Sequence, residues 1–76
     1  MAQIIQRGEH IVHIRFEGRS WDVAASTLGL GNAANEDTVK LAVARYLEVA
    51  VARLATYIVE FHESGAITLR PEAVFG

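Results

Sequence analysis

The chain has 76 residues, 51% of them hydrophobic, a net charge of −2 and no cysteine. This length predicts one domain over residues 1–76, and the lack of cysteine excludes disulfides and thiolate zinc sites, so that packing must supply the stability. The acidic balance excludes a general nucleic-acid binder, which needs a basic face, and the absence of a run of 18 apolar residues excludes a membrane span.

Two strand-like runs come first. Ala2–Arg7 is a short run with an apolar centre, and the pair Gly8-Glu9 ends it. Ile11–Phe16 alternates between two faces, which is the period of a strand with one buried side. The face predicted to be buried carries Val12, Ile14 and Phe16, and the opposite face carries Ile11, His13 and Arg15.

A hairpin is predicted at Glu17-Gly18, because glycine supplies the positive φ that a tight turn requires. Ser20–Val23 then forms the returning strand, with Trp21 inward and Asp22 outward. Together with Ala2–Arg7, these runs predict two successive hairpins in a three-stranded meander.

Ala24–Ala34 connects these strands to a helix. Leu28 and Leu30 are expected to plug the core below the helix entrance. Gly29 and Gly31 supply bends. A phosphate-binding loop would need a strand directly before this Gly-x-Gly spacing, a helix directly after it, and a lysine or a third glycine. We therefore interpret the segment as a structural loop.

Asn35–Tyr57 contains the only long helical pattern. Asn35 can cap the helix, since its side-chain carbonyl accepts from an unpaired first-turn N–H. Glu36 and Asp37 place negative charge at the positive end of the helix dipole, and Glu36 precedes Lys40 in the favourable order for an ion pair. The apolar face comprises Val39, Val43, Tyr46, Leu47, Ala50, Leu54 and Tyr57.

The end of this helix is poorly marked. No Gly, Pro, Asn or Ser follows Glu36 until Ser64, so no helix breaker is present. Residues 57–61 are β-branched and aromatic, which is the composition of a strand. We predict a helix over about 36–48, a second short helix near 51–56 and a strand from 57. A single helix that continues to 57 is the alternative, since the apolar phase is unbroken.

Two further strands are predicted after the helix. Tyr57–Phe61 alternates, and the turn residues 62–65 lead to a return strand over Ala66–Arg70. Pro71 ends this strand because proline has no N–H to give to a ladder. The tail beyond it contains large apolar residues that either dock on the core or meet a partner.

The predicted order is β-β-β-α-β-β, an α+β domain of two layers with one main helix on a mainly antiparallel sheet of about five strands. The succession of two strands, a helix and two strands loosely resembles the β-grasp plan of ubiquitin-like domains. This likeness concerns topology alone and implies no activity. The predicted core comprises Ile4, Val12, Ile14, Phe16, Trp21, Val23, Leu28, Leu30, Val39, Val43, Tyr46, Leu47, Leu54, Tyr57, Val59, Phe61, Ile67 and Leu69.

No residue pattern predicts catalysis, a metal site or a cofactor. His10 and His13 face opposite sides of a strand, and His13 could share the outer face with His62 only if their strands are neighbours. Capping and turn roles explain the serines and threonines of the turns and connections. We therefore expect no catalytic residue, no metal ligand and no cofactor.

The outward positions indicate an interaction surface. The outer sheet face mixes apolar and charged residues, and Leu41 lies about 160° from Val43 on the helix wheel, away from the core. The candidate interface comprises Ile11, His13, Arg15, Leu41, Ile58, Glu60, Arg70 and Phe75.

We predict a small, soluble, non-enzymatic interaction module that self-associates as a symmetric homodimer. The reason is that 27 residues are apolar and larger than alanine, which is more than a single small core can bury. The sheet face is the preferred contact, with Ile11 and Ile58 at its centre. Arg15, Glu60 and Arg70 would form pairs across the twofold.

Two alternatives remain open. The first is a ubiquitin-like carrier, which this chain resembles in its terminal Gly76. Phe75 departs from the Gly-Gly ending of that family. A small enzyme or ligand-binding domain is the third reading. The first ten residues lack the basic start and the long apolar segment of a signal peptide, so we expect a cytoplasmic location.

Overall fold

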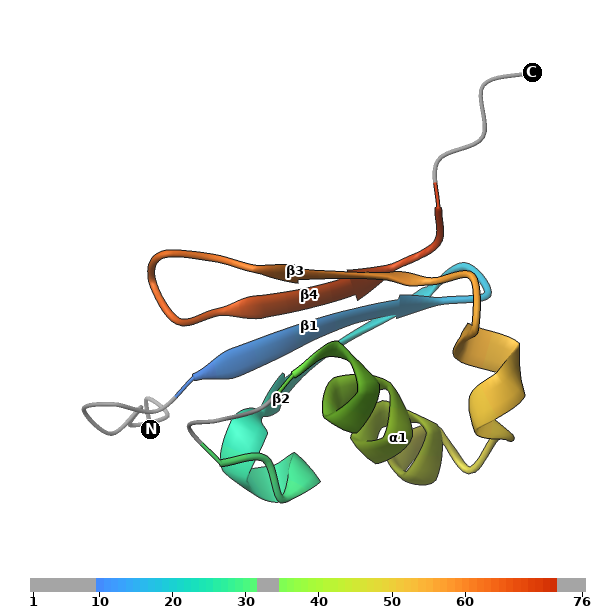
Figure 1. Cartoon of the computed structure of the whole chain (residues 1–76), viewed down its shortest axis with the longest axis horizontal. Helices are drawn as coiled ribbons and strands as arrows, with labels where there is room; N and C mark the ends of the chain where they lie inside the picture. Colours follow the sequence, from blue (N-terminus) through green and yellow to red (C-terminus); the bar gives the residue numbers. More distant parts are fainter. Residues whose placement is uncertain (1–9, 32–34, 73–76) are drawn as a thin grey trace.

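The computed structural model describes residues 10–31 and 35–72. Its elements are β1 (Ile11–Phe16), β2 (Arg19–Ala24), the 3₁₀ helix η1 (Ala25–Leu28), α1 (Glu36–Leu47), the 3₁₀ helix η2 (Val51–Leu54), β3 (Ile58–Phe61) and β4 (Ile67–Arg70). The strands form one layer and the helices lie together on one side of it (Figure 1). The chain is thus a small α+β domain, as predicted, and no helix among these residues is long and apolar enough to cross a bilayer.

The sheet is mixed and has the strand order β2-β1-β4-β3. β1 pairs with β2 and β3 pairs with β4 in antiparallel fashion, whereas β1 and β4 are parallel. Four strands are seen in the described residues, not about five. Ala2–Arg7, and the hairpin predicted between this run and β1, lie outside these residues.

The predicted β1–β2 hairpin is confirmed. Glu17 and Gly18 have φ values of 50° and 78°, and Phe16 pairs with Arg19 across this two-residue turn. Positive φ at both central residues matches the right-handed twist of the strands that the turn joins. The turn between β3 and β4 likewise uses Gly65, at φ 94°, where a Cβ atom would lie only 2.2 Å from Nδ1 of His10.

The core lies between the helices and the central strands. Inward side chains of β1 and β4, such as Ile14 and Leu69, meet Val39 and Val43 of α1 and Leu54 of η2, and all five are fully buried. Each such side chain contributes about 1.5–3 kcal/mol of transfer free energy. The buried apolar residues are Val12, Ile14, Phe16, Val23, Ala25, Val39, Val43, Ala44, Leu54, Ile67 and Leu69.

Two residues predicted to lie in the core are exposed. Tyr46 is 43% exposed, because α1 turns the flank that carries Ala44 inward instead. Lys40 lies on that same flank and donates to the Ala55 carbonyl at 3.3 Å, which places η2 against it. Phe61, the last residue of the edge strand β3, is 53% exposed although its partner Ile67 is buried.

The start of α1 agrees with the predicted cap. The Asn35 side chain accepts from the Thr38 N–H at 2.9 Å, and the Thr38 hydroxyl accepts from the Asn35 N–H at 2.8 Å. This reciprocal pair satisfies two backbone donors at the helix start. The predicted Glu36–Lys40 ion pair is also present, at 3.4 Å.

The end of α1 has a cap that the sequence conceals. Glu48 adopts a left-handed conformation, with φ 60° and ψ 45°. Its N–H donates to the Arg45 carbonyl at 3.2 Å, and the Val49 N–H donates to the Ala44 carbonyl at 2.9 Å. These are the two bonds of a Schellman motif, in which glycine usually takes the left-handed position. The prediction of two helices is confirmed, and the alternative of one helix to 57 is wrong.

Replacing Glu48 with glycine should stabilise the domain by about 1 kcal/mol, because a left-handed conformation costs about 1–2 kcal/mol for a residue with a Cβ atom. Chemical denaturation should show a higher midpoint at an unchanged slope. Glu48→Ala removes the charge but keeps the Cβ atom, so it should stabilise the domain less than Glu48→Gly does. Arg45→Gly, inside the helix, should destabilise by about 1 kcal/mol. Equal effects of Glu48→Gly and Glu48→Ala would contradict a conformational cause.

Candidate functional site

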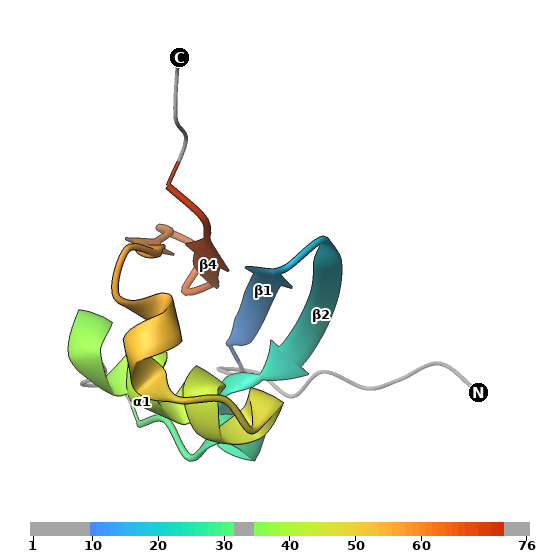
Figure 2. The same cartoon turned by 90° about the vertical axis from the view of Figure 1, so that its right-hand side faces the viewer.

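The predicted interface residues that the structure describes fall in two separate places. Leu41 is 45% exposed on α1, as predicted. Phe75 lies outside the described residues. The others belong to the outer face of the sheet, on the side opposite the helices, where no described element covers them (Figures 1 and 2). These outer-face residues are Ile11, His13, Arg15, Ile58, Glu60 and Arg70.

A polar row crosses this outer face. His13 pairs in register with Asp22 on one side and with Thr68 on the other, and Thr68 pairs with Glu60. Nδ1 of His13 lies 2.8 Å from the Asp22 carboxylate, and Nε2 of His62 lies 2.8 Å from the Thr68 hydroxyl. His13 and His62 therefore share a face, but β4 separates their strands. The polar side chains of the row thus have partners within one chain: His13 and Asp22 pair with each other, Thr68 pairs with His62, and Glu60 pairs with Arg70.

Glu60 and Arg70 form a two-pronged pair at the same face. Nε and one terminal nitrogen of Arg70 each lie 3.2 Å from a Glu60 oxygen. Hydrogen bonding from Arg70 lowers the pKa of Glu60, and the same bond raises the pKa of Arg70. We expected these two charges to pair across a twofold axis. Each side chain already has a partner in its own chain, and pairing across a twofold stays a prediction.

The two isoleucines do not form an apolar centre. Ile11 pairs with Ala24 at one end of the hairpin, and Ile58 pairs with Arg70 at the opposite edge of the sheet. The row that contains His13 and Thr68 runs between them. A polar strip therefore lies between the two isoleucines, and their part in a dimer contact stays a prediction.

The His13–Asp22 pair of the outer face contains one part of an acid–base arrangement. A carboxylate that holds Nδ1 of a histidine can orient the ring as a general base, but the base must face a held substrate. Three concavities are found among the described residues, and none of the three is lined by His13 or Asp22. Within residues 10–31 and 35–72, no cluster of three or more His, Asp or Glu side chains could hold a metal ion.

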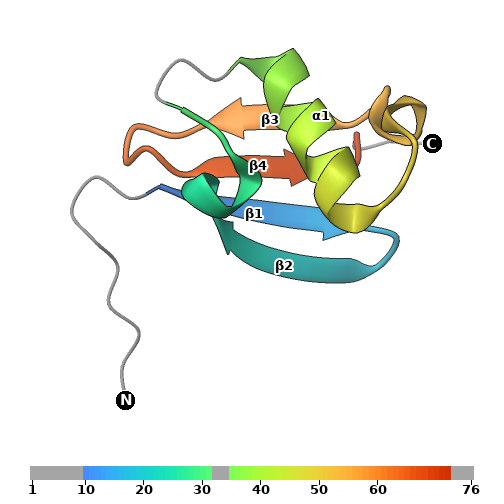
Figure 3. The same ribbon diagram turned by 90° about the horizontal axis from the view of Figure 1, so that it is seen from below.

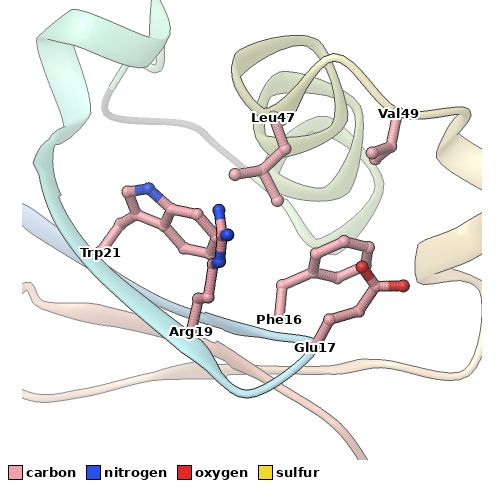
Figure 4. Close-up of a pocket in the computed structure, with 6 residues that line it drawn as sticks. All are labelled: Phe16, Glu17, Arg19, Trp21, Leu47 and Val49. Carbon is pink, nitrogen blue, oxygen red and sulfur yellow. The ribbon is translucent and has the colours of Figure 1, made fainter.

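A groove on the opposite, helix-bearing side is the better candidate site. It has a volume of about 450 Å³ and lies between the β1–β2 hairpin and the end of α1 (Figure 4). We call it the hairpin–helix groove. It is lined by Phe16, Glu17, Arg19, Trp21, Leu47 and Val49.

Two short segments of the chain form the walls of this groove. In β2 the side chains of Arg19 and Trp21 are two residues apart and point to the helix side of the sheet (Figure 4). On the other wall, the left-handed Glu48 turns the chain so that Leu47 and Val49 both reach the groove. Trp21, Leu47 and Val49 are half-buried, so they stand between the core and solvent, whereas Phe16 is buried.

The hairpin end of the groove is held to η2. Arg53 forms an ion pair with Glu17, and its guanidinium carbon lies 5.2 Å above the ring of Phe16. The Phe16 ring also packs against Tyr57, with 5.6 Å between the ring centres. Glu17 is thus neutralised. By contrast, the Arg19 side chain makes no ion pair or hydrogen bond to any described residue.

Sequence reasoning did not find this groove. It assigned Trp21 to the core, whereas the residue packs against the core with one side only. A signal was available in the pattern: Trp21 follows Arg19 by two residues, so a cation and a large aromatic residue share one strand face. The opposite wall could not be predicted, because it depends on the unmarked end of α1.

Acidification should reveal the Glu60–Arg70 pair. The pKa of Glu60 is lowered in the folded chain from its ordinary value of 4.5, so its contribution to stability is present above that value and is lost as the pH falls through the lowered pKa. Glu60→Gln should make the free energy of unfolding less dependent on pH below about pH 5. Denaturation at several pH values measures this. Glu63→Gln, at an exposed turn carboxylate, is the matched control, and equal slopes for both variants would contradict the assignment.

Comparison with known proteins does not identify a family for this chain. No family model matches the chain, and no curated protein or solved structure is significantly similar to it. Its function must therefore be argued from the geometry and chemistry of its own surfaces.

Proposed function

We propose that this chain is a small non-enzymatic protein-interaction domain and that the hairpin–helix groove is its main binding surface. The observation that carries the proposal is the combination of half-buried Trp21, Leu47 and Val49 around an open volume of about 450 Å³. Aromatic and aliphatic side chains gathered in a concavity are the usual anchors of protein binding.

The chemistry of the two faces supports the groove over the outer sheet face. On the outer face, His13–Asp22 and Glu60–Arg70 pair within the chain, so a partner would have to desolvate groups that are already satisfied. In the groove the apolar side chains of Trp21, Leu47 and Val49 are half-buried, and Arg19 has no partner among the described residues. Burial there gains hydrophobic free energy and offers one charge to a ligand.

Affinity capture with a groove variant tests this function. The bait is the whole chain, beside Trp21→Lys and the matched control Ile11→Lys, which places the same charge on the outer face. Proteins bound by the original chain and by Ile11→Lys should be lost from Trp21→Lys, because a lysine in the groove is desolvated without a partner. Circular dichroism establishes that each variant is folded. Partners retained by Trp21→Lys and lost from Ile11→Lys would refute the groove as the binding surface.

The carrier reading is the alternative proposal. The described succession of two strands, a helix and two strands supports a likeness to the β-grasp plan of ubiquitin-like domains. The residues that would decide it, Phe75 and Gly76, lie outside the described part of the chain. A carrier role therefore stays a prediction, and the groove does not bear on it.

Self-association is a second candidate, supported by apolar exposure in the helical layer. Leu41 of α1 and Val51 of η2 are each 45% exposed. Because the outer sheet face is divided by its polar row, we propose that a symmetric homodimer would use the helical layer rather than the sheet face. An isologous contact would bury these side chains against their counterparts.

Light scattering should then report about twice the chain mass of 8.3 kDa at micromolar concentration. Leu41→Glu should yield a folded monomer, since a charge would be buried without a partner, whereas Ile58→Glu should remain dimeric. A monomer that persists at a several-fold higher concentration would end the dimer proposal. A monomer from Ile58→Glu alone would return the contact to the sheet face.

A further inference from the structure

The groove lies beside a strand edge that no described residue pairs with. β2 is an edge strand of the sheet, and β1 is its neighbour on the inner side. Six consecutive residue pairs join β1 and β2 without a bulge, and β2 contains no proline. Alternate residues of such a strand direct their N–H and C=O groups away from the sheet, which makes the edge a template for a further strand. The opposite edge, β3, has only four residues.

α1 leaves the hairpin half of the helix-side face of β2 uncovered, where Arg19 is exposed and Trp21 is half-buried, whereas Val23 further along the strand is buried. Figure 3 shows α1 crossing β3, β4 and β1, with β2 beyond its end, and Figure 2 shows the hairpin end of β2 standing apart from the helices. A segment added to this edge would therefore run along the mouth of the hairpin–helix groove. Its side chains on that face would enter between Trp21 and Leu47.

The charge of the groove selects the ligand. Two charged side chains line it, and Glu17 is neutralised by Arg53. Arg19 keeps its charge without a partner in the described residues and stands two positions from Trp21 on the same strand face. Side chains of an added strand also recur on one face at every second residue. A carboxylate facing Arg19 would thus be two residues from an apolar side chain facing Trp21.

We propose that the groove binds an extended peptide segment of a partner protein, which pairs with the free edge of β2 and carries an acidic residue two positions from a large aliphatic or aromatic residue. The backbone of the segment supplies hydrogen bonds to β2, and its alternate side chains supply the selectivity. Both orders of the two residues are compatible, because parallel and antiparallel addition reverse them. This inference rests on the proposed interaction function and specifies its ligand.

Trp21 provides the assay, since it is the only tryptophan of the chain. The probes are ten-residue, threonine-rich synthetic peptides that contain one aspartate and one isoleucine. In one set the two are separated by two positions, in either order, and in the matched set by three, which places them on opposite faces of a strand. The first set should shift the Trp21 emission saturably and bind at least about tenfold more tightly than the second.

Charge reversal makes the test specific. Arg19→Glu should weaken the preferred peptides about tenfold and should favour the same peptides with lysine in place of aspartate. Arg15→Glu, which makes the same change on the outer face of the hairpin, should leave both affinities unchanged. Arg19 is exposed, so its replacement leaves the core intact.

Three results would overturn the inference: no peptide shifts the Trp21 emission up to millimolar concentration, the two spacings bind equally, or Arg19→Glu has the same preference as the original chain. Each of these leaves the interaction function standing if protein capture still depends on Trp21. Loss of that dependence, by contrast, removes the interaction function and the peptide inference together.

Discussion

The parallel pairing of β1 with β4 is the constraint on which the rest of the structure depends. Parallel neighbours cannot be joined by a tight turn, so the chain between them must cross over one face of the sheet. Here the chain between β1 and β4 contains β2, η1, α1, η2 and β3, and its helices lie on one face of the sheet (Figure 1). The crossover covers the central strands on one side, and that is where the fully buried side chains Ile14 and Leu69 lie. The outer face keeps its polar row because no described element returns across it.

The width of one helix then determines where the molecule is open. A helix with its side chains is about 10–12 Å across, whereas four strands spaced by about 4.8 Å form a wider layer. One helix can cover the two central strands and part of a third. In this domain the uncovered part is the hairpin half of the inner face of β2, where Trp21 lies half-buried, whereas Val23 further along the strand is buried. The groove is thus a consequence of placing a single helix on four strands.

Much of the fold could be predicted because its signals are local. Alternation identified β1 and β2, the Glu17-Gly18 turn identified their hairpin, and Asn35 identified the start of α1. The parallel pairing of β1 with β4 could not be read in this way, since it joins residues about fifty positions apart through backbone bonds that any side chain permits.

The candidate site was less predictable, because it depends on distant contacts. The sequence placed Glu60 and Arg70 on the outer face but could not show that they pair within the chain. The sequence alone could not show that Ile11 and Ile58 lie far apart, because their separation depends on the strand order. The inward turn of Ala44 and the exposure of Tyr46 follow from η2, whose position no local pattern reports.

The left-handed Glu48 has a consequence for how binding and folding are connected. No residue type near it stops the helix, so the break after Leu47 exists only while Val49 and η2 are packed in the folded domain. The wall of the groove is therefore absent from the unfolded chain, and a ligand in the groove binds the native state alone. By mass action such a ligand raises the unfolding free energy of the entire domain. In a chain of this small size, the margin of stability is narrow, so ligand binding in the groove and folding of the domain are thermodynamically linked.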